Sequence, residues 1–160
     1  MTAVHGRVAG VFVASAATAP MEPVEAATAV AGVGLDGDRY AAGVGTWSED
    51  GRLWGQVTLI EAEAVEAVAR ETGSHVDPSD TRRNVVTTGV PLNHLVDREF
   101  RVGEATLRGV RLCEPCTHLE RVSGKPLRKP LVHRGGLNAL IVDGGTIRVG
   151  DAITAPEEDP

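Results

Sequence analysis

Cys113 and Cys116 are the two cysteines of the chain, and they stand at the end of an apolar run. Pro115, which precedes Cys116, is tolerated where a helix begins, because the N–H that proline lacks has no helical partner there. We therefore expect a short helix to start at Pro115 and to place Cys116 in its first turn, beside free N–H groups and the positive end of the helix dipole. Such surroundings lower the pKa of a thiol and favour the thiolate, which binds metals and attacks electrophiles.

The same Cys-x-x-Cys sequence has three other interpretations. In the first, both thiols are buried and inert and pack as small hydrophobic groups. In the second, Cys113, Cys116, His118 and His133 hold a structural zinc ion, although one Cys-x-x-Cys supplies only half of the usual ligands. In the third, the cysteines form a thioredoxin-like dithiol, although the βαβ context of that motif is missing. His118 lies two residues after Cys116, so on a helix it would point elsewhere.

Basic residues near two glycine-marked segments could bind an anion. Arg82 and Arg83 are adjacent at the start of an expected strand, so their side chains would point to opposite faces. At most one of them could then enter a given pocket as part of the strand. Arg134 precedes Gly135–Gly136, whose backbone N–H groups could form an anion-binding nest.

Asp38 and Arg39 lie in the glycine-dense stretch Gly32–Tyr40. The glycine spacing is wrong for a dinucleotide-binding loop, and no helical pattern follows it. We expect Asp38 and Arg39 to pair with each other or to cap the turn, with a direct cofactor contact as the alternative.

Length and composition indicate a single globular domain. The 160 residues are 42% hydrophobic and 24% charged, a profile typical of folded proteins in which about 70% of the surface is buried. Aromatic residues make up only 3% while there are 19 glycines, which suits short strands and many turns, as in a barrel, better than a helical bundle.

Charge and hydropathy limit the classes of function. A net charge of -6 argues against a general nucleic-acid binder but permits a local basic pocket. No apolar run of about 18 residues is present, so we expect no membrane span. The N-terminus lacks the pattern of a signal peptide, so we expect a cytoplasmic protein whose cysteines do metal or redox work.

Hydrophobic patterning predicts mainly strands and one clear helix. The helix is expected over Glu61–Thr72 with Gly73 as its C-cap. A hairpin turn is expected at 143–145, returning through Val149. Residues 15–31 fit a weak strand or a loop, 122–132 a loop with at most a helical turn, and 155–160 a disordered acidic tail. The other expected strands are Val8–Val13, 55–60, 85–88, Phe100–Val102, 105–112 with a bulge at Gly109, and Asn138–Val142.

Five motifs in order resemble the MOSC domain, the C-terminal domain of molybdenum cofactor sulfurases, and are similar to its small stand-alone bacterial members. The motifs are Gly34–Tyr40, Arg82–Asn84, Leu112–Cys116, Arg134–Leu137 and Gly145–Asp151. The resemblance covers about residues 8–153 of a single domain spanning 1–160. It implies a mainly β (α+β) fold, a mainly antiparallel β-barrel with a few short helices.

The resemblance also implies a working cysteine that ligates molybdenum or carries sulfur. Motif position assigns this role, and the metal bond, to Cys116, with Cys113 as the fallback. The pterin phosphate of the molybdenum cofactor would be held by a basic pocket. Tyr40 stands where some relatives have His, so no proton-transfer role is carried over to it. Candidate cofactor-binding residues are Arg82, Arg83, Asn84, Arg134, Asp38 and Arg39.

These features lead to several functional hypotheses. The leading one is a protein that binds the molybdenum cofactor, or carries a persulfide received from a cysteine desulfurase, through Cys116. A second is a molybdenum-dependent reductase of N-hydroxylated compounds, whose electrons would come from a partner protein because no flavin, nicotinamide or iron–sulfur motif is present. A third is a non-enzymatic module with a structural, zinc-bound or metal-free, Cys-x-x-Cys. Pyridoxal phosphate is a further candidate ligand for the basic pocket, although no lysine of the chain stands in a recognisable Schiff-base context.

Overall fold

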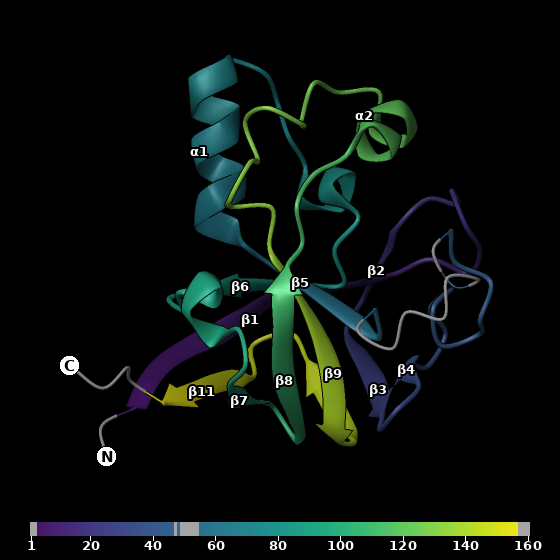
Figure 1. The fold of residues 1–160 in the computed structure, drawn as a ribbon, viewed down its shortest axis with the longest axis vertical. Helices are drawn as coiled ribbons and strands as arrows, with labels where there is room; N and C mark the ends of the chain where they lie inside the picture. The colour runs from purple at the N-terminus through teal and green to yellow at the C-terminus, as the bar shows by residue number, and fades with distance from the viewer. Residues whose placement is uncertain (1–2, 47, 49–54, 157–160) are drawn as a thin grey trace.

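The fold is a β-barrel with most of its helical segments at one end, as the computed structural model shows for residues 3–46, 48 and 55–156 (Figure 1). Within these residues, seven strands follow one another in the order β11-β7-β8-β9-β5-β6-β1, and β1 pairs with β11 to close the barrel. The barrel strands are β1 (Ala3–Val13), β5 (Val57–Glu61), β6 (Val85–Thr88), β7 (Glu99–Val102), β8 (Ala105–Leu112), β9 (Leu137–Asp143) and β11 (Ala152–Pro156).

A smaller sheet and four short helices complete the described part of the chain. β10 (Gly145–Arg148), β3 (Ala26–Val30) and β4 (Gly34–Leu35) form the small sheet, and β2 (Glu22–Val24) pairs with the end of β1. The helices are α1 (Ala62–Thr72), α2 (Thr117–Ser123) and the 3-10 turns η2 (Pro78–Thr81) and η3 (Leu92–Leu95). The expected mainly β barrel with a few short helices is therefore confirmed. None of these helices has the length and apolar composition needed to span a membrane.

Helix α1 connects the parallel strand pair of the barrel. β5 and β6 run parallel, while the other paired strands run antiparallel. Parallel neighbours need a crossover connection, and α1 supplies it. The helix buries Ala64, Val65 and Val68 and ends at Gly73, whose φ of 68° is left-handed, so the predicted helix and its C-cap are confirmed.

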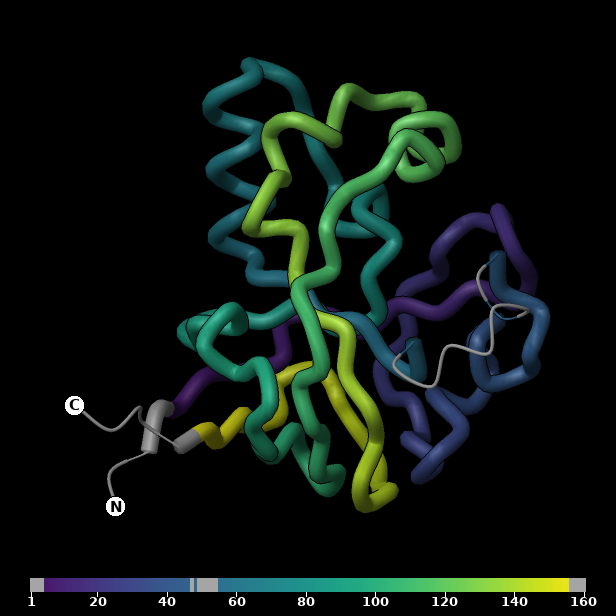
Figure 2. Tube along the Cα trace, in the orientation of Figure 1, coloured from purple at the N-terminus to yellow at the C-terminus, as the bar shows by residue number. Residues whose placement is uncertain are grey.

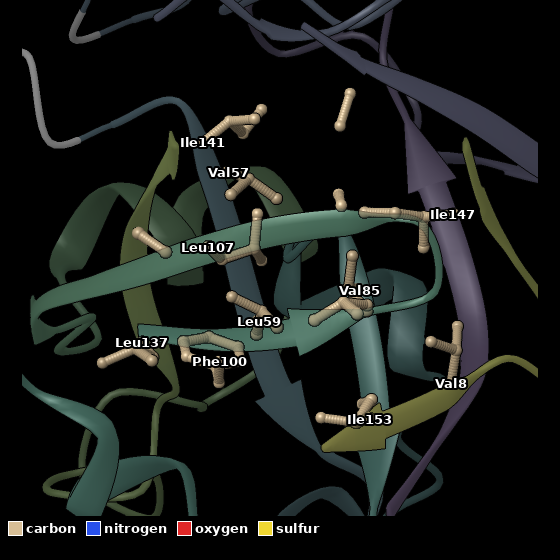
Figure 3. Close-up of a cluster of buried hydrophobic side chains, with 14 of the residues drawn as sticks. Val8, Val57, Leu59, Val85, Phe100, Leu107, Leu137, Ile141, Ile147 and Ile153 are labelled. Carbon is tan, nitrogen blue, oxygen red and sulfur yellow. The ribbon is translucent and has the colours of Figure 1, made fainter. Parts of the chain in front are cut away.

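Two apolar clusters lie on opposite sides of the barrel wall. Side chains such as Leu59 and Val85 fill the barrel interior (Figure 3). Their neighbours Ile60 and Val86 point the other way, because successive residues of a strand face opposite sides, and they pack under α1 and the segment that follows α2. A second apolar core therefore covers the outer side of this wall. It includes Leu119 of α2 and so holds that helix against the barrel.

The expected hairpin at residues 143–145 is wrong. β10 pairs with β3 of the small sheet, with Thr146 opposite Thr28, and not with β9. A Cβ on Gly144 would lie 2.7 Å from the carbonyl oxygen of Ala29, and one on Gly145 would lie 2.6 Å from that of Glu104. Neither glycine has the positive φ of a type I′ turn. The two glycines let the chain pass closely between other backbones instead of reversing it.

The remaining differences concern ambiguous segments. Residues 15–31 contain both β2 and β3, and the bulge expected at Gly109 is present as a register shift between β8 and β9. Ala155 and Pro156 belong to β11, where Pro156 lies opposite Ala3, so the two ends of the barrel chain lie side by side (Figure 2). The expected tail is therefore wrong for these two residues, and residues 157–160 lie outside the described part.

Gly136 is the position where a methyl group should damage this fold most clearly. Its φ is 110°, and a Cβ would lie 1.9 Å from the carbonyl oxygen of Leu59. We expect Gly136→Ala to lower the free energy of unfolding by about 3 kcal/mol or more, because strain and overlap add. Gly73→Ala is the matched control, since it is left-handed but has open space around it, and should cost about 1 kcal/mol. Urea denaturation measures both, and equal losses would contradict the close-approach argument.

Candidate functional site

A cavity of about 410 Å³ brings together most of the chemistry predicted from the sequence. It lies where the end of β8 leads into α2, beside β5 and the loop that follows β4 (Figure 1). The lining residues are Gly32, Val33, Arg39, Tyr40, Gly43, Thr46, Ser48, Gly55, Gln56, Thr58, Arg82, Arg83, Arg111, Cys113, Glu114, Cys116, His118, Leu119 and Asn138.

Both cysteines line this cavity as free, half-buried thiols. α2 begins at Thr117 and not at Pro115, so Cys116 is the N-cap residue, with an extended backbone and a carbonyl that accepts the N–H of Leu119 at 3.1 Å. Residues 113–116 form no turn or bend that would bring the two free cysteines together, as a disulfide requires. The dithiol interpretation is therefore disfavoured.

The two cysteines differ in their surroundings. Cys113 has a fixed backbone, because its N–H donates to Gly136 at 2.8 Å and its carbonyl accepts from Arg83 at 2.9 Å. Cys116 packs against the apolar cluster under α1 and stands at the start of α2. Cys113 therefore belongs to the barrel wall, whereas Cys116 lies at the junction between the wall and the helical end.

His118 also lines the cavity, which corrects the expectation that it would point away from Cys116. The expectation assumed that both residues are helical, but Cys116 precedes the helix. His118 Nε2 lies 3.4 Å from the Thr46 hydroxyl, across the cavity. Burial lowers the pKa of His118 below its usual 6.5, and the nearby cations Arg82, Arg121 and Arg39 lower it further. The imidazole is therefore neutral at neutral pH and can donate or accept a hydrogen bond.

Arg82 and Arg83 both line the cavity, although adjacent strand residues would face opposite sides. The premise is wrong because β6 starts only at Val85, and Arg82 is the left-handed C-cap of η2 with φ 60°. Arg82 donates to the carbonyl of Ala19 at 2.7 Å. Burial lowers the pKa of Arg82, and repulsion from Arg39 lowers it further, but a guanidinium remains protonated in proteins.

Arg83 is occupied by the protein itself. Its Nε donates to Gly135 at 2.8 Å, one terminal nitrogen to Thr81 at 3.0 Å and the other to Cys113 at 2.9 Å, all three acceptors being backbone carbonyls. These bonds use three of the five N–H donors of the guanidinium, one on each nitrogen. Arg83 therefore shapes the cavity wall and contributes charge, while its hydrogen bonds are used for structure.

Asp38 and Arg39 form the expected pair, with Arg39 Nη1 3.0 Å from Asp38 Oδ1. Asp38 is buried, accepts from the N–H groups of Ala14 and Tyr40, and does not line the cavity, whereas Arg39 does. The guanidinium of Arg39 lies 4.7 Å from the centre of the Tyr40 ring. Arg39 is thus held by a carboxylate and an aromatic face at the edge of the cavity.

Asn84 is a structural residue in this arrangement. Its Oδ1 accepts from the N–H and the hydroxyl of Thr58, and its Nδ2 donates to the carbonyl of Phe12 at 3.1 Å. It does not line the cavity. These bonds connect β5 to β1 next to the cavity, so the Asn84 side chain stabilises the strands that form the cavity wall.

Arg134 lies outside the cavity and is bound to α1. Its Nη2 forms an ion pair with Glu71 at 2.5 Å, and its Nε donates to the carbonyl of Pro130 at 2.7 Å. A Cβ on Gly135 would lie 2.5 Å from the carbonyl oxygen of Cys113. The two glycines after Arg134 thus permit close backbone packing. This packing explains why glycine is needed there without the expected anion-binding nest.

The four residues of the zinc hypothesis are not brought together. His133 lies on the exposed side, where its Nδ1 is 2.9 Å from Glu114 Oε2. Among the residues that the structure describes, no three His, Cys, Asp or Glu side chains are grouped so that they could hold a metal ion. The geometry thus offers cysteine thiols as single ligands and not a protein-made zinc centre.

The sequence analysis missed the polar residues of the cavity floor, Gln56, Thr58 and Asn138. Thr58 and Asn138 each interrupt an apolar strand, Thr58 between Val57 and Leu59, and Asn138 between Leu137 and Ala139. A polar residue that faces away from the barrel interior inside a buried strand is the signal that could have found them.

The cavity carries an excess of positive charge although the whole chain carries -6. Four arginines and one glutamate line it, and no lysine is found among the described lining residues. Asp38 offsets part of the charge of Arg39 from behind. The site therefore favours an anionic ligand beside a cysteine thiol.

Replacing Arg83 should destabilise the protein far more than replacing an exposed arginine. We expect Arg83→Gln to lower the free energy of unfolding by about 3 kcal/mol or more, because buried carbonyls of three segments lose their donor. Arg134→Gln, which breaks an ion pair between half-exposed side chains, should cost less than about 1 kcal/mol. Chemical denaturation of both variants tests this, and similar small losses would show that Arg83 does not hold the wall together.

The titration of His118 should reflect its burial and its cationic neighbours. We expect an NMR titration midpoint below 6.5, and a higher midpoint in Arg82→Gln. Because the pKa is lower in the folded state, the unfolded chain takes up this proton first as the pH falls below about 6.5, so His118 destabilises the fold on acidification. Arg148→Gln, which removes a cation not among these neighbours, should leave the midpoint unchanged. A midpoint above 6.5 in the wild type would contradict the conclusion that burial and nearby cations lower the pKa of His118.

Comparison with solved structures finds the same fold in other proteins. The YuaD protein from Bacillus subtilis matches with a TM-score of 0.80 and 16% identity, over 98% of this chain and 99% of that one. YiiM from Geobacillus stearothermophilus matches with 0.73 and 12%, over 95% and 75%. YiiM from Escherichia coli matches with 0.67 and 16%, over 96% and 71%. At these identities the likeness establishes the fold.

Comparison of sequences identifies the family. No curated protein matches the chain. The family model described as the MOSC domain matches residues 50–154, well over half of the chain, and this range includes both cysteines and three of the four cavity arginines. The chain therefore belongs to the MOSC domain family, which is associated with binding of the molybdenum cofactor.

Proposed function

We propose that this protein binds the molybdenum cofactor in the cavity and that Cys116 ligates the metal. The observation that supports this most is that two free cysteines and four arginines line one cavity of about 410 Å³ with a single carboxylate. Family membership makes the molybdenum cofactor the first ligand to consider for such a site.

The residues present fit the chemistry of that group. A thiolate is a soft ligand for a transition metal, and guanidinium groups bind phosphate through paired N–H donors. Arg39, Arg82 and Arg111 are the first candidates for the phosphate, since Arg83 donates from all three of its nitrogens to backbone carbonyls. When bound, the cofactor would supply a redox-active metal with a position open to a substrate.

Cys116 is a better candidate than Cys113 for the reactive thiol. It follows Pro115 at the start of α2, it lines the cavity together with His118, and its motif position matches the family's working cysteine. The imidazole of His118, neutral at neutral pH, can hold or release a proton in the same cavity. Cys113 stays the fallback, since it lines the cavity as well.

Sulfur transfer is the second candidate function, and it is supported by the same free thiol in an open cavity. The Cys116 thiolate would attack the outer sulfur of a persulfide on a cysteine desulfurase, forming a new S–S bond while the donor's S–S bond breaks and its cysteine leaves as thiolate. The reductase alternative instead needs a separate electron-transfer protein. The phosphate of pyridoxal phosphate could also be held by the arginines, in which case no metal would be found.

Metal content distinguishes these functions. We expect protein produced with an ample supply of the cofactor to contain near-stoichiometric molybdenum by elemental mass spectrometry, and Cys116→Ala to contain less than a tenth of that amount. Cys113→Ala is the matched control and should keep most of the metal.

Each other outcome changes the assignment. Loss of molybdenum only in Cys113→Ala would move the metal bond to Cys113. No molybdenum in the wild type, together with a mass increase of one sulfur on Cys116 after incubation with a desulfurase, would replace cofactor binding by sulfur transport. Stoichiometric zinc would contradict both proposals.

A further inference from the structure

The floor of the cavity is a row of three residues on neighbouring strands. Arg111 of β8 and Thr58 of β5 both lie opposite Asn138 of β9 in the antiparallel register. Residues opposite each other in such a pair share a face, with Cβ atoms about 5 Å apart. Leu137 and Ala139 belong to the barrel core, so Asn138 faces outward, and all three residues of the row line the cavity.

Within the described part of the chain, Asn138 is the member of this row whose side-chain amide has no hydrogen-bond partner. It is 5% exposed, and its side-chain amide makes no hydrogen bond with any residue that the structure describes. No side-chain nitrogen or oxygen in the described part is both cut off from solvent and unpaired, so the amide must reach the cavity space. An amide that opens into a cavity completes its hydrogen bonds with water or with a ligand that fills the cavity.

The neighbouring polar groups show that this is not a general feature of the floor. The Thr58 hydroxyl donates to Asn84 Oδ1 at 3.2 Å, and Gln56 Oε1 accepts the N–H of Ile141 at 2.8 Å. Both side chains are thus used by the fold. Asn138 lies between Thr58 and Arg111 with its donor and acceptor both available to a ligand.

We propose that Asn138 recognises the ring of the bound ligand through a pair of hydrogen bonds. A side-chain amide presents a C=O acceptor and an N–H donor side by side, and the complementary group is a lactam edge, in which an N–H adjoins a C=O. A pterin ring has such an edge, so this inference rests on the proposed function and specifies which residue selects the ring. Arg111, the next residue in the row, places a cation beside the same ring.

The test measures ring binding without the metal. Full-length protein is titrated with 6-carboxypterin, whose fluorescence reports binding, and with 2-naphthoate, a flat two-ring carboxylate without a lactam edge. We expect Asn138→Leu to weaken 6-carboxypterin binding at least tenfold and to leave 2-naphthoate binding within twofold. Asn93→Ala, which changes an exposed asparagine outside the cavity, is the matched control and should bind both probes like the wild type.

Folding is checked by thermal unfolding of each variant. Since the Asn138 amide bonds no described residue, Asn138→Leu should unfold within a few degrees of the wild type. If leucine is not tolerated, Asn138→Ala removes the same hydrogen bonds without adding bulk and carries the same tenfold expectation. The comparison therefore does not depend on one substitution.

Unchanged 6-carboxypterin binding in the Asn138 variants, or equal losses for both probes, would overturn the inference. So would a wild type that binds inorganic phosphate at this site but neither ring, since the arginines alone would then explain binding. Molybdenum content separates this result from the proposed function. If the wild type holds molybdenum but the Asn138 variants bind 6-carboxypterin normally, cofactor binding stands and the role of Asn138 is wrong. If 6-carboxypterin binding depends on Asn138 but the wild type holds no molybdenum, the role of Asn138 stands and the proposed function is wrong.

Discussion

The buried guanidinium of Arg83 is the interaction on which the site depends. It donates to the backbone carbonyls of Thr81, Cys113 and Gly135. These three segments are far apart in the sequence: β6, β7 and β8 lie between the first two, and α2 lies between the last two. A buried cation is stable only when its donors are satisfied, and a planar fork of N–H groups can satisfy three acceptors that a lysine could not reach together. The end of β8, the start of β9 and the turn before β6 are thereby fixed with respect to one another.

Close backbone packing makes that arrangement possible. Gly135 packs against the carbonyl of Cys113, and Gly136 packs against the carbonyl of Leu59. Neither position has room for a Cβ. The cavity consequently has one stiff wall, made of paired strands and the Arg83 bonds, and an opposite side made of α2 and the loop that follows β4. Cys113 and Asn138 lie on the wall of paired strands, whereas Cys116 and His118 lie where the chain leaves it.

The sequence allowed the local elements to be predicted but not how they pair. The helix before Gly73 and the bulge at Gly109 follow from local patterns, and both are present. The pairing of β10 with β3 depends on contacts between segments more than a hundred residues apart, and glycine chemistry alone suggested a hairpin there. In the site, the cysteines and two arginine segments were identified by residue type. The direction of Arg82 and His118 toward the cavity was not predicted, because it depends on where a helix or turn begins or ends.

The charge of the cavity links the fold to its ligand. Arg39 Nη2 donates to the Arg82 carbonyl at 3.4 Å, so the two guanidinium-bearing residues are held together, and repulsion between them adds to the burial that lowers the pKa of Arg82. Asp38 compensates Arg39 but lies behind it, away from the cavity. An anion bound in front of both arginines would reduce this repulsion and replace lost hydration. Because such an anion binds the folded chain and not the unfolded one, its binding energy adds to the stability of the fold. Asp38 and several backbone carbonyls hold the arginine side of the cavity in place, and a bound anion would stabilise it further.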